Sequence, residues 1–333
     1  MKKLLFITLA VLSCITNIDA LVVKNPVDYV NPLVGTASKS ELSTGNTYPA
    51  IALPWAMNFW TAQTGKMGDG WTYVYGADKI RGIKQTHQPS PWINDYGQFA
   101  FMPITGKKVF DEEGRASWFS HKAETATPYY YKVRLKRYGV LVEITPTHHA
   151  ALYRLTYPAR YVADSTASLL LDICHNIPEH VYPAINGRYL GGEIKYDPTE
   201  RLITGYGEYM GGFGSADSYR VYFAMSSDNV DFSKAQIQQT AYDNGRVKTR
   251  KYAKIPVEVN VADVRIAVSL RSVDNAKRFL REETDGKDFA TVAENGRQAW
   301  NNTLGRIKID AQTDEEAELF YTSLYFSHVM PRD

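Results

Sequence analysis

Residues that could bind a substrate are most concentrated between Asn31 and Gly106. This stretch combines scattered glycines with tryptophan, histidine and aspartate, and the candidates for ligand contact are Trp71, His87, Trp92 and Asp95. Glycines permit irregular loops, and binding groups usually lie on loops carried by a rigid scaffold. An exposed tryptophan offers a flat face to the C–H groups of a sugar ring, and histidine or aspartate hydrogen-bonds its hydroxyls. The pattern is compatible with a sugar site, although core packing is the commoner role of any single tryptophan.

Other chemically capable residues have simpler interpretations. Trp55 lies in an apolar stretch and is expected in the core, and His87 could serve only to fix the proline-containing loop that follows it. His148 and His149 are expected on a strand, where neighbouring side chains point to opposite faces and cannot share a metal ion. Three acidic pairs are expected in solvated turns and helix starts: Glu112-Glu113, Glu282-Glu283 and Glu315-Glu316. A glycosidase requires two carboxylates that face each other across a cleft. Nothing in the sequence places two acidic side chains in this way.

The composition excludes several classes of protein. The chain has 333 residues with 38 basic and 36 acidic side chains, a formal charge of +2, and 44% hydrophobic residues. This balance excludes a disordered chain and a strongly basic nucleic-acid-binding protein. The 13% of aromatic residues suits a sheet-rich fold. Cys14 and Cys174 are the only cysteines, so no intramolecular disulfide is expected once an N-terminal signal is removed, and Cys174 is expected to be a buried thiol.

The N-terminus has the pattern of an export signal. Residues 1–20 begin with two lysines, continue through an apolar run that is too short to span a bilayer, and end in small or polar residues. Cleavage after Ala20 would give a soluble periplasmic protein. Cleavage before Cys14, in a stretch similar to a bacterial lipobox, would instead give an outer-membrane lipoprotein with a lipid anchor on that cysteine.

Alternating apolar and polar residues predict β-strands over most of residues 28–270. The alternation over 131–135 resumes over 140–144 after Tyr138-Gly139, which predicts a hairpin with one buried face. Further strands are expected at 152–157, 168–173, 219–225, 257–261 and 264–270. Many short strands without intervening helices indicate an antiparallel sandwich.

After residue 270 the apolar period becomes helical. Asp274 is expected to cap a short helix, and a longer helix follows over 289–304. Thr313 and Glu316 have the spacing of a capping box for a third helix, whose stripe on one face is expected to be formed by Ala317, Phe320, Leu324 and His328. Such a stripe must be covered by another element. The last helix is therefore either a tail that docks on the sandwich or the first helix of a further domain.

A series of short motifs resembles glycoside hydrolase family 92, in the family's order along the whole mature chain. The motifs are VNPLVGT (30–36), GNTYPA (45–50), LP (53–54), GWTY (70–73), IRG (80–82), TH (86–87), DYG (95–97), MPITG (102–106), FSHKAE (119–124), PYY (128–130), WN (300–301), LG (304–305) and FYTSLY (320–325). The resemblance implies an exo-acting α-mannosidase of α-1,2 type that inverts configuration with the help of calcium and acts on mannose-containing glycans.

The resemblance also implies a domain organisation. An antiparallel β-sandwich (supersandwich) is expected over 21–272, a helical linker over 273–313, and the start of a truncated (α/α)6 barrel over 314–333. The catalytic acid and base and most calcium ligands of the family lie in that barrel, so none is assigned to this chain. The implied sugar contacts are Trp71, His87 and Asp95. The residues after the first motif, and the loop 88–94 that contains Trp92, depart from the family pattern, which leaves the linkage preference open.

Three hypotheses follow. The chain is the N-terminal part of an exported α-mannosidase, a stand-alone carbohydrate-binding or interaction module, or the partner of a separately encoded barrel. The apolar stripe of the last helix favours the first hypothesis, because a stand-alone module would leave it partly bare. In each case the isolated chain is expected to bind sugar without hydrolysing it.

Overall fold

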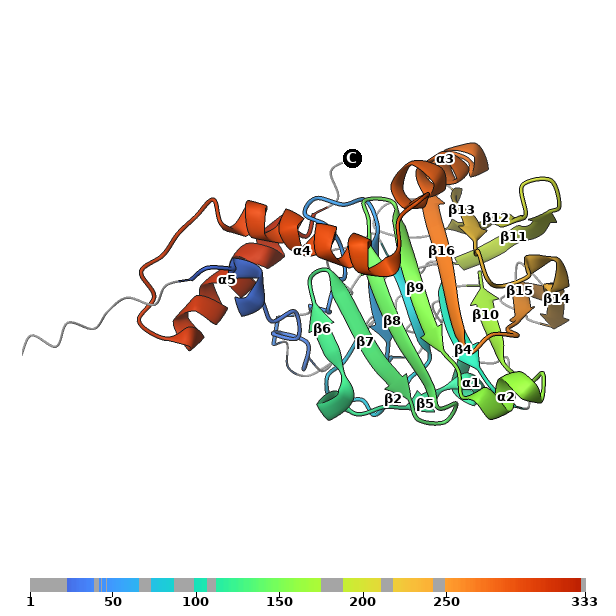
Figure 1. Cartoon of the computed structure of the whole chain (residues 1–333), viewed down its shortest axis with the longest axis horizontal. Helices are drawn as coiled ribbons and strands as arrows, with labels where there is room; N and C mark the ends of the chain where they lie inside the picture. Colours follow the sequence, from blue (N-terminus) through green and yellow to red (C-terminus); the bar gives the residue numbers. More distant parts are fainter. Residues whose placement is uncertain are drawn as a thin grey trace, which may run out of the picture.

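The protein is a sandwich of two antiparallel sheets, followed by three helices that pack against it (Figure 1). The computed structural model describes residues 23–38, 42, 44–45, 47–65, 73–86, 99–106, 112–174, 188–210, 218–241 and 249–330. The predicted fold class, mainly antiparallel β with helices at the C-terminal end, is confirmed.

The smaller main sheet has six strands in the order β1-β3-β4-β10-β15-β14. Its strands are β1 (Phe59–Gln63), β3 (Gly82–Thr86), β4 (Ala100–Ile104), β10 (Ser168–Asp172), β15 (Thr249–Pro256) and β14 (Gln236–Ala241). The larger sheet has the order β11-β12-β13-β16-β9-β8-β7-β6. Its strands are β11 (Arg188–Asp197), β12 (Leu202–Met210), β13 (Ser218–Ser226), β16 (Val261–Ser269), β9 (Ala150–Thr156), β8 (Val140–Pro146), β7 (Tyr130–Leu135) and β6 (Thr125–Thr127).

The remaining elements are short, apart from the three C-terminal helices. A two-stranded ribbon pairs β2 (Lys79–Ile80) with β5 (Ser117–Trp118). The helices are η1 (Pro26–Tyr29), α1 (Glu112–Arg115), η2 (His121–Ala123), α2 (Ala159–Ala163), η3 (Phe232–Lys234), α3 (Val273–Thr284), α4 (Phe289–Leu304) and α5 (Asp314–His328). Among the described residues, no helix is long and apolar enough to cross a membrane.

Aromatic contacts fill the space between the two sheets. The ring of Trp60 in β1 meets that of Tyr153 in β9 edge to face at 5.8 Å, and Phe99 meets Phe223 at 5.1 Å. The predicted hairpin is β7–β8, in which Val133 faces Val142, both fully buried. Sheet packing therefore accounts for much of the aromatic content. Cys174 is buried just after β10 and forms no disulfide bond, as expected.

Two local predictions were wrong. Residues 257–260 are not a strand but the connection between β15 in one sheet and β16 in the other. The side chain that caps α3 belongs to Ser272 rather than Asp274, since its oxygen accepts from the backbone N–H of Asn275 at 3.1 Å.

The helices cover the outer face of the larger sheet and one of its edges (Figure 1). Helix α3 lies on small side chains of three neighbouring strands, namely Ala150, Ala224 and Ala267. Phe289 and Val292, in the first turn of α4, pack against Leu152 on the same face of the sheet. The sheet is thus covered on both faces over this part of its surface.

Helices α4 and α5 are tied to the segment that precedes β1. The fully buried indole of Trp300 donates from Nε1 to the carbonyl of Ala52 at 2.8 Å. The hydroxyl of Tyr325 donates to the carbonyl of Ala50 at 2.6 Å, and the two rings lie 5.1 Å apart. These bonds satisfy two buried carbonyls that have no strand partner, and they fix both helices on the sandwich.

The capping-box prediction for α5 is confirmed only for the N-cap Thr313, because the Glu316 carboxylate accepts from the N–H of Gln312 at 2.7 Å rather than from that of Thr313. The buried face of α5 also differs from the prediction. The hydroxyl of Thr313 accepts from the N–H of Glu316 at 3.2 Å. Ala317 is buried as predicted, but the rest of the buried face is formed by Tyr321, Thr322 and Tyr325. The other predicted members, Phe320, Leu324 and His328, are only partly buried.

Replacing Trp300 by alanine should destabilise the fold. The substitution removes a fully buried ring and leaves the carbonyl of Ala52 without its donor. We expect a loss of about 3–5 kcal/mol in the free energy of unfolding, measured by urea denaturation. Gln298→Ala, on the exposed side of the same helix, is the control and should change stability by less than about 0.5 kcal/mol. Equal losses in the two variants would contradict the proposed attachment of α4.

Candidate functional site

The four residues expected to contact sugar, Trp71, His87, Trp92 and Asp95, lie outside the described residues. Their described neighbours nevertheless show where these segments leave the sandwich. Thr86, directly before His87, pairs with Phe59 at the beginning of β1. Val74, which follows Trp71 by three residues, donates to the Thr64 hydroxyl just beyond the end of β1, at 2.7 Å. The two segments therefore join the β1–β3 pair at opposite ends.

The end at which β3 finishes is shared by both sheets, and we call it the α3 end of the sandwich. In the smaller sheet this end contains Thr86, the last residue of β3, and Asp172, which pairs with Ala100 at the start of β4. In the larger sheet it contains His149, which precedes β9, and Ser269, the last residue of β16. Helix α3 begins directly beyond Ser269, and Figure 1 shows it at this end. The described residues that flank segment 87–98 thus lie beside the beginning of the helical region.

A buried amide network fixes the root of this segment. Gln85, two residues before His87, donates from Nε2 to Oδ1 of Asn58 at 2.8 Å. Asn58 in turn donates from Nδ2 to the carbonyls of His149 at 2.9 Å and Val268 at 3.2 Å. Because these residues belong to different sheets, the network holds the end of β3 in a fixed position relative to β9 and β16.

Glu283, in the last turn of α3, forms hydrogen bonds with the turn between β8 and β9. Its carboxylate accepts from the backbone N–H of His149 at 2.9 Å and from the Thr147 hydroxyl, and it lies 2.5 Å from His149 Nδ1. Phe279 stacks on the His149 ring at 3.6 Å, with 9° between the planes. Burial alone would raise the pKa of Glu283, but the hydrogen bonds from His149 and Thr147 outweigh it and lower that pKa.

This arrangement corrects two expectations. His148 and His149 lie in the turn between β8 and β9 rather than on a strand, with His148 exposed and His149 buried. Glu283, expected in a solvated segment, is a largely buried partner of that turn. The residues are 134 positions apart in the sequence, and no local pattern signals their contact.

Trp55 is also not a core residue. It is partly exposed, adopts a left-handed backbone conformation with φ of 60°, and packs its ring 4.7 Å from that of His328. Its N–H donates to the His328 carbonyl at 3.0 Å. The end of α5 is thereby held beside the segment that leads into β1.

A hollow of about 490 Å³ opens beside α3 at this end. It is lined by Met57, His149, Ser269, Leu270, Arg271, Asn275, Arg278, Phe279, Glu282 and Glu283. Amide, guanidinium and carboxylate groups there could hydrogen-bond a polar ligand. The two carboxylates are already engaged, since Glu283 binds the β8–β9 turn and Glu282 lies 3.0 Å from Arg278.

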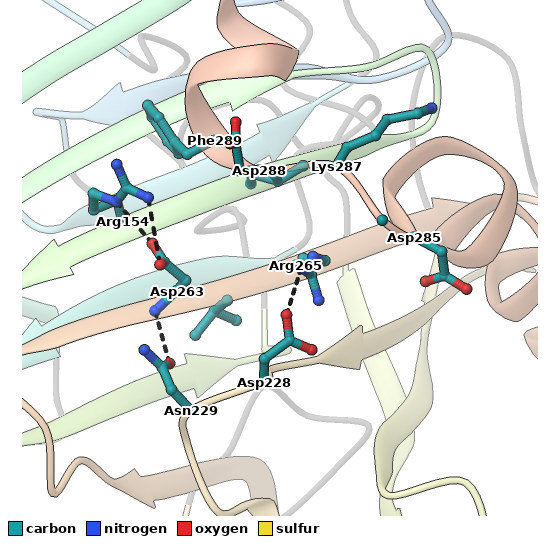
Figure 2. A pocket seen from close by; sticks show the side chains of 12 residues that line it. Arg154, Asp228, Asn229, Asp263, Arg265, Asp285, Lys287, Asp288 and Phe289 are labelled. Atoms are coloured by element: carbon teal, nitrogen blue, oxygen red, sulfur yellow. Dashed lines mark hydrogen bonds and ion pairs between the residues drawn. The ribbon is translucent and has the colours of Figure 1, made fainter.

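A second hollow, of about 540 Å³, lies on the outer face of the larger sheet between α3 and α4 (Figure 2). Arg154 donates from Nε to Asp263 at 2.9 Å, and Arg265 donates to Asp228 at 2.6 Å, which lowers the pKa of Asp228. The Arg154 guanidinium also covers the ring of Phe289 at 5.0 Å. Asp263 on β16 and Asp228 in the loop after β13 are therefore held in ion pairs, an arrangement that supports the sheet rather than acid–base catalysis.

The described residues can be examined for side chains that could bind calcium. Within them, no group of three or more histidine, cysteine, aspartate or glutamate side chains is arranged to hold a metal ion. The described part of the chain therefore offers no cluster of acidic ligands that fits calcium, which prefers several oxygen ligands.

The architecture is that of a β-sandwich module that continues into helices at one end. The glycosyl hydrolase family 92 N-terminal domain matches residues 29–272, and the catalytic domain of the same family matches residues 275–333. The chain therefore belongs to glycoside hydrolase family 92. The first match ends directly before α3, and the second begins in the first turn of that helix.

Solved structures agree with this assignment. A family GH92 inverting mannosidase from Bacteroides thetaiotaomicron is 33% identical with a TM-score of 0.78, over 92% of this chain and 40% of its own. A family GH92 α-mannosidase from the same organism is 26% identical with a TM-score of 0.75, over 92% and 41%. The latter is also known in complex with mannoimidazole.

A curated relative comes from a fungus. A protein of Arthroderma benhamiae described as an uncharacterized secreted glycosidase is 24% identical over 341 residues, which cover 92% of this chain and 41% of the relative. The chain thus spans about 40% of the length of the relatives it matches.

Replacing Glu283 by glutamine should weaken the attachment of α3 in a pH-dependent way. At about pH 7 we expect a loss of roughly 1–3 kcal/mol in the free energy of unfolding, because a charged acceptor of three hydrogen-bond donors is removed. The carboxyl has a lowered pKa in the folded state, so its contribution is present above its unfolded pKa of about 4.3 and is lost as the pH falls through the lower folded pKa. Urea denaturation at several pH values measures this difference.

Glu282→Gln is the matched control, since the Glu282 carboxylate is 57% exposed and, among the described residues, forms an ion pair only with Arg278 in the same helix. We expect this variant to follow the wild type within about 0.5 kcal/mol across the pH range. A stability difference between wild type and Glu283→Gln that stays constant down to acid pH would contradict the role assigned to the charged carboxylate.

Proposed function

We propose that the chain is the N-terminal part of an exo-acting α-mannosidase of α-1,2 type that releases terminal mannose from glycans with inversion. The observation that carries this proposal is the 33% identity to an inverting mannosidase over 92% of the chain, at a TM-score of 0.78. In this proposal the loops that carry Trp71, His87, Trp92 and Asp95 position the sugar, and α3 to α5 begin the helical domain. A binding module without hydrolytic activity is less well supported, because the family's catalytic domain matches residues 275–333.

The proposed chemistry divides the work between two parts of the enzyme. Inversion needs a general acid on the leaving oxygen and a base that activates water on the opposite face of the ring. We assign neither role to the described carboxylates at the two hollows, because the resemblance places both roles in the barrel and because Glu282, Glu283, Asp228 and Asp263 are held in ion pairs and hydrogen bonds. The sandwich contributes by orienting the sugar, through His87, Trp92 and Asp95 in the segment that leaves the α3 end and through Trp71.

Calcium belongs to this proposal as an expectation from the resemblance. The described residues hold no cluster that fits calcium, and the resemblance implies that most of its ligands lie in the helical barrel. We therefore assign no calcium ligand to this chain, and none of the roles given above to it involves the metal.

We further propose that the protein is exported. The support is the signal-like sequence of residues 1–20 together with the description of the fungal relative as secreted. Mass spectrometry of the mature N-terminus distinguishes a soluble periplasmic protein that begins at Leu21 from an outer-membrane lipoprotein that begins at a lipidated Cys14.

The activity can be tested with the chain alone and with a chimera. Purified residues 21–333 should release no mannose from α-1,2-mannobiose, with or without calcium. The same segment fused to the remaining catalytic domain of the Bacteroides inverting mannosidase should release mannose, and proton NMR should detect the β-anomer first. A chimera that folds but cleaves only other glycosides, or that first releases the α-anomer, would contradict the proposal. So would hydrolysis by residues 21–333 alone, since no acid or base is assigned to them.

Two tryptophan variants test which ring contacts the sugar. Trp71→Ala should weaken mannose binding by the chain more than Trp55→Ala does, because Trp71 is the proposed stacking residue. Trp55→Ala should instead lower the melting temperature, since its ring packs against His328 at the end of α5. Calorimetric titration with methyl α-mannoside and thermal melting of both variants measure the two effects, and the reverse order of affinities would refute the assignment.

A further inference from the structure

Two aromatic rings stand out on the surface at the end of the sandwich opposite α3. Of the aromatic side chains in the described residues, only Tyr75 and Trp118 are exposed, to 42% and 50%. Trp118 lies in β5, which pairs with β2, and Figure 1 shows this ribbon at the lower edge of the molecule, away from α3. The backbone connects the two neighbourhoods, because Phe119 donates to the carbonyl of Asp78, three residues after Tyr75.

The ring of Tyr75 is held from one side. It stacks on the His121 ring at 4.0 Å with 13° between the planes, and His121 Nε2 donates to the carbonyl of Tyr75 at 2.7 Å. Since one face is packed, the exposed share of the ring belongs to its other face and its edge. Tyr75 therefore presents a flat surface to solvent.

Glu124 makes this arrangement rigid. Its side chain is 1% exposed, lies 2.6 Å from His121 Nδ1, and accepts hydrogen bonds from the hydroxyls of Tyr73 at 2.9 Å and Tyr131 at 2.6 Å. A buried carboxylate with three partners cannot move without leaving charge unsatisfied. His121, and the Tyr75 ring stacked on it, are consequently fixed by the sheet itself.

Trp118 is held in a similar manner. The ammonium group of Lys79, its partner across the ribbon, lies 5.1 Å from the centre of the ring. The Trp118 carbonyl accepts from the N–H of Lys136 at 2.8 Å, which fixes the backbone. The half of the ring that remains exposed is again a flat apolar surface beside a hydrogen-bond donor.

The surroundings of the rings favour a sugar over a protein partner. The neighbouring residues Asp78, Lys122 and Lys136 are exposed and charged, so the rings do not form part of a broad apolar patch. A stable protein interface needs about 800 Å² from each side with an apolar centre. A sugar needs only one ring face for its C–H groups and a few polar groups for its hydroxyls.

We propose that Tyr75 and Trp118 form a glycan-binding surface that stacks on pyranose units of a polysaccharide chain, with Lys79 as a donor to its hydroxyls. The surface would hold the protein on a glycan that presents many mannose ends. The choice of mannan as the probe rests on the proposed function, but the surface itself does not.

The test is affinity electrophoresis of residues 21–333 in gels that contain soluble α-mannan. The wild type should be retarded, and Trp118→Ala and Tyr75→Ala should each weaken binding by roughly three- to tenfold, in line with the loss of one ring contact. Trp118→Phe, which keeps a ring, should retain most of the retardation. Leu319→Ala removes a side chain that is 70% exposed on α5 and is the control for loss of apolar surface.

Thermal melting of each variant separates loss of binding from loss of folding. Retardation that is unchanged in both alanine variants, or absent in the wild type, would overturn the proposal. So would retardation that disappears at high salt but is insensitive to both ring substitutions, since binding would then depend on charge alone. The proposed function is tested separately, with the chimera, and fails if the chimera releases no mannose from mannobiose. That result would not bear on the glycan-binding surface, because mannobiose is too small to require it.

Discussion

The larger sheet has to be covered on both of its faces, and the rest of the structure follows from this constraint. Its inner face packs against the smaller sheet through aromatic contacts such as that of Trp60 with Tyr153. Its outer face carries the small side chains Ala150, Ala224 and Ala267, on which α3 can lie closely. Because α3 packs on these residues, the chain that follows it lies along the sheet, and α4 and α5 pack on the segment before β1.

Polar contacts then define where the covering helices sit. An apolar face alone allows a helix to slide or rotate, whereas a buried hydrogen bond is satisfied in one position only. Glu283 on the β8–β9 turn, Trp300 on Ala52 and Tyr325 on Ala50 each fix one of the three helices. The helices at the start of the catalytic-domain match are therefore integral to the sandwich.

Much of the fold was predictable from the sequence, because it depends on local periodicity. The alternation in the β7–β8 hairpin and the period over Phe289–Leu304 both reflect a single buried face. The segment 257–260 was misjudged because alternating valines look alike in a strand and in a chain that crosses between sheets. The contact of Glu283 with His149 was missed for a related reason, since it joins distant parts of the chain. The candidate sugar contacts came from loop motifs, which carry no periodicity, and they remain predictions.

Cys174 has a consequence for how the protein can be made. It is buried at the end of β10 and forms no disulfide bond, and the other cysteine of the chain lies in the predicted signal. The sandwich is held by packing and hydrogen bonds without a covalent cross-link. Maturation of residues 21–333 should therefore need neither an oxidant nor a disulfide isomerase, and the domain should reach the same native state in an anaerobic or reducing environment as in an oxidising one.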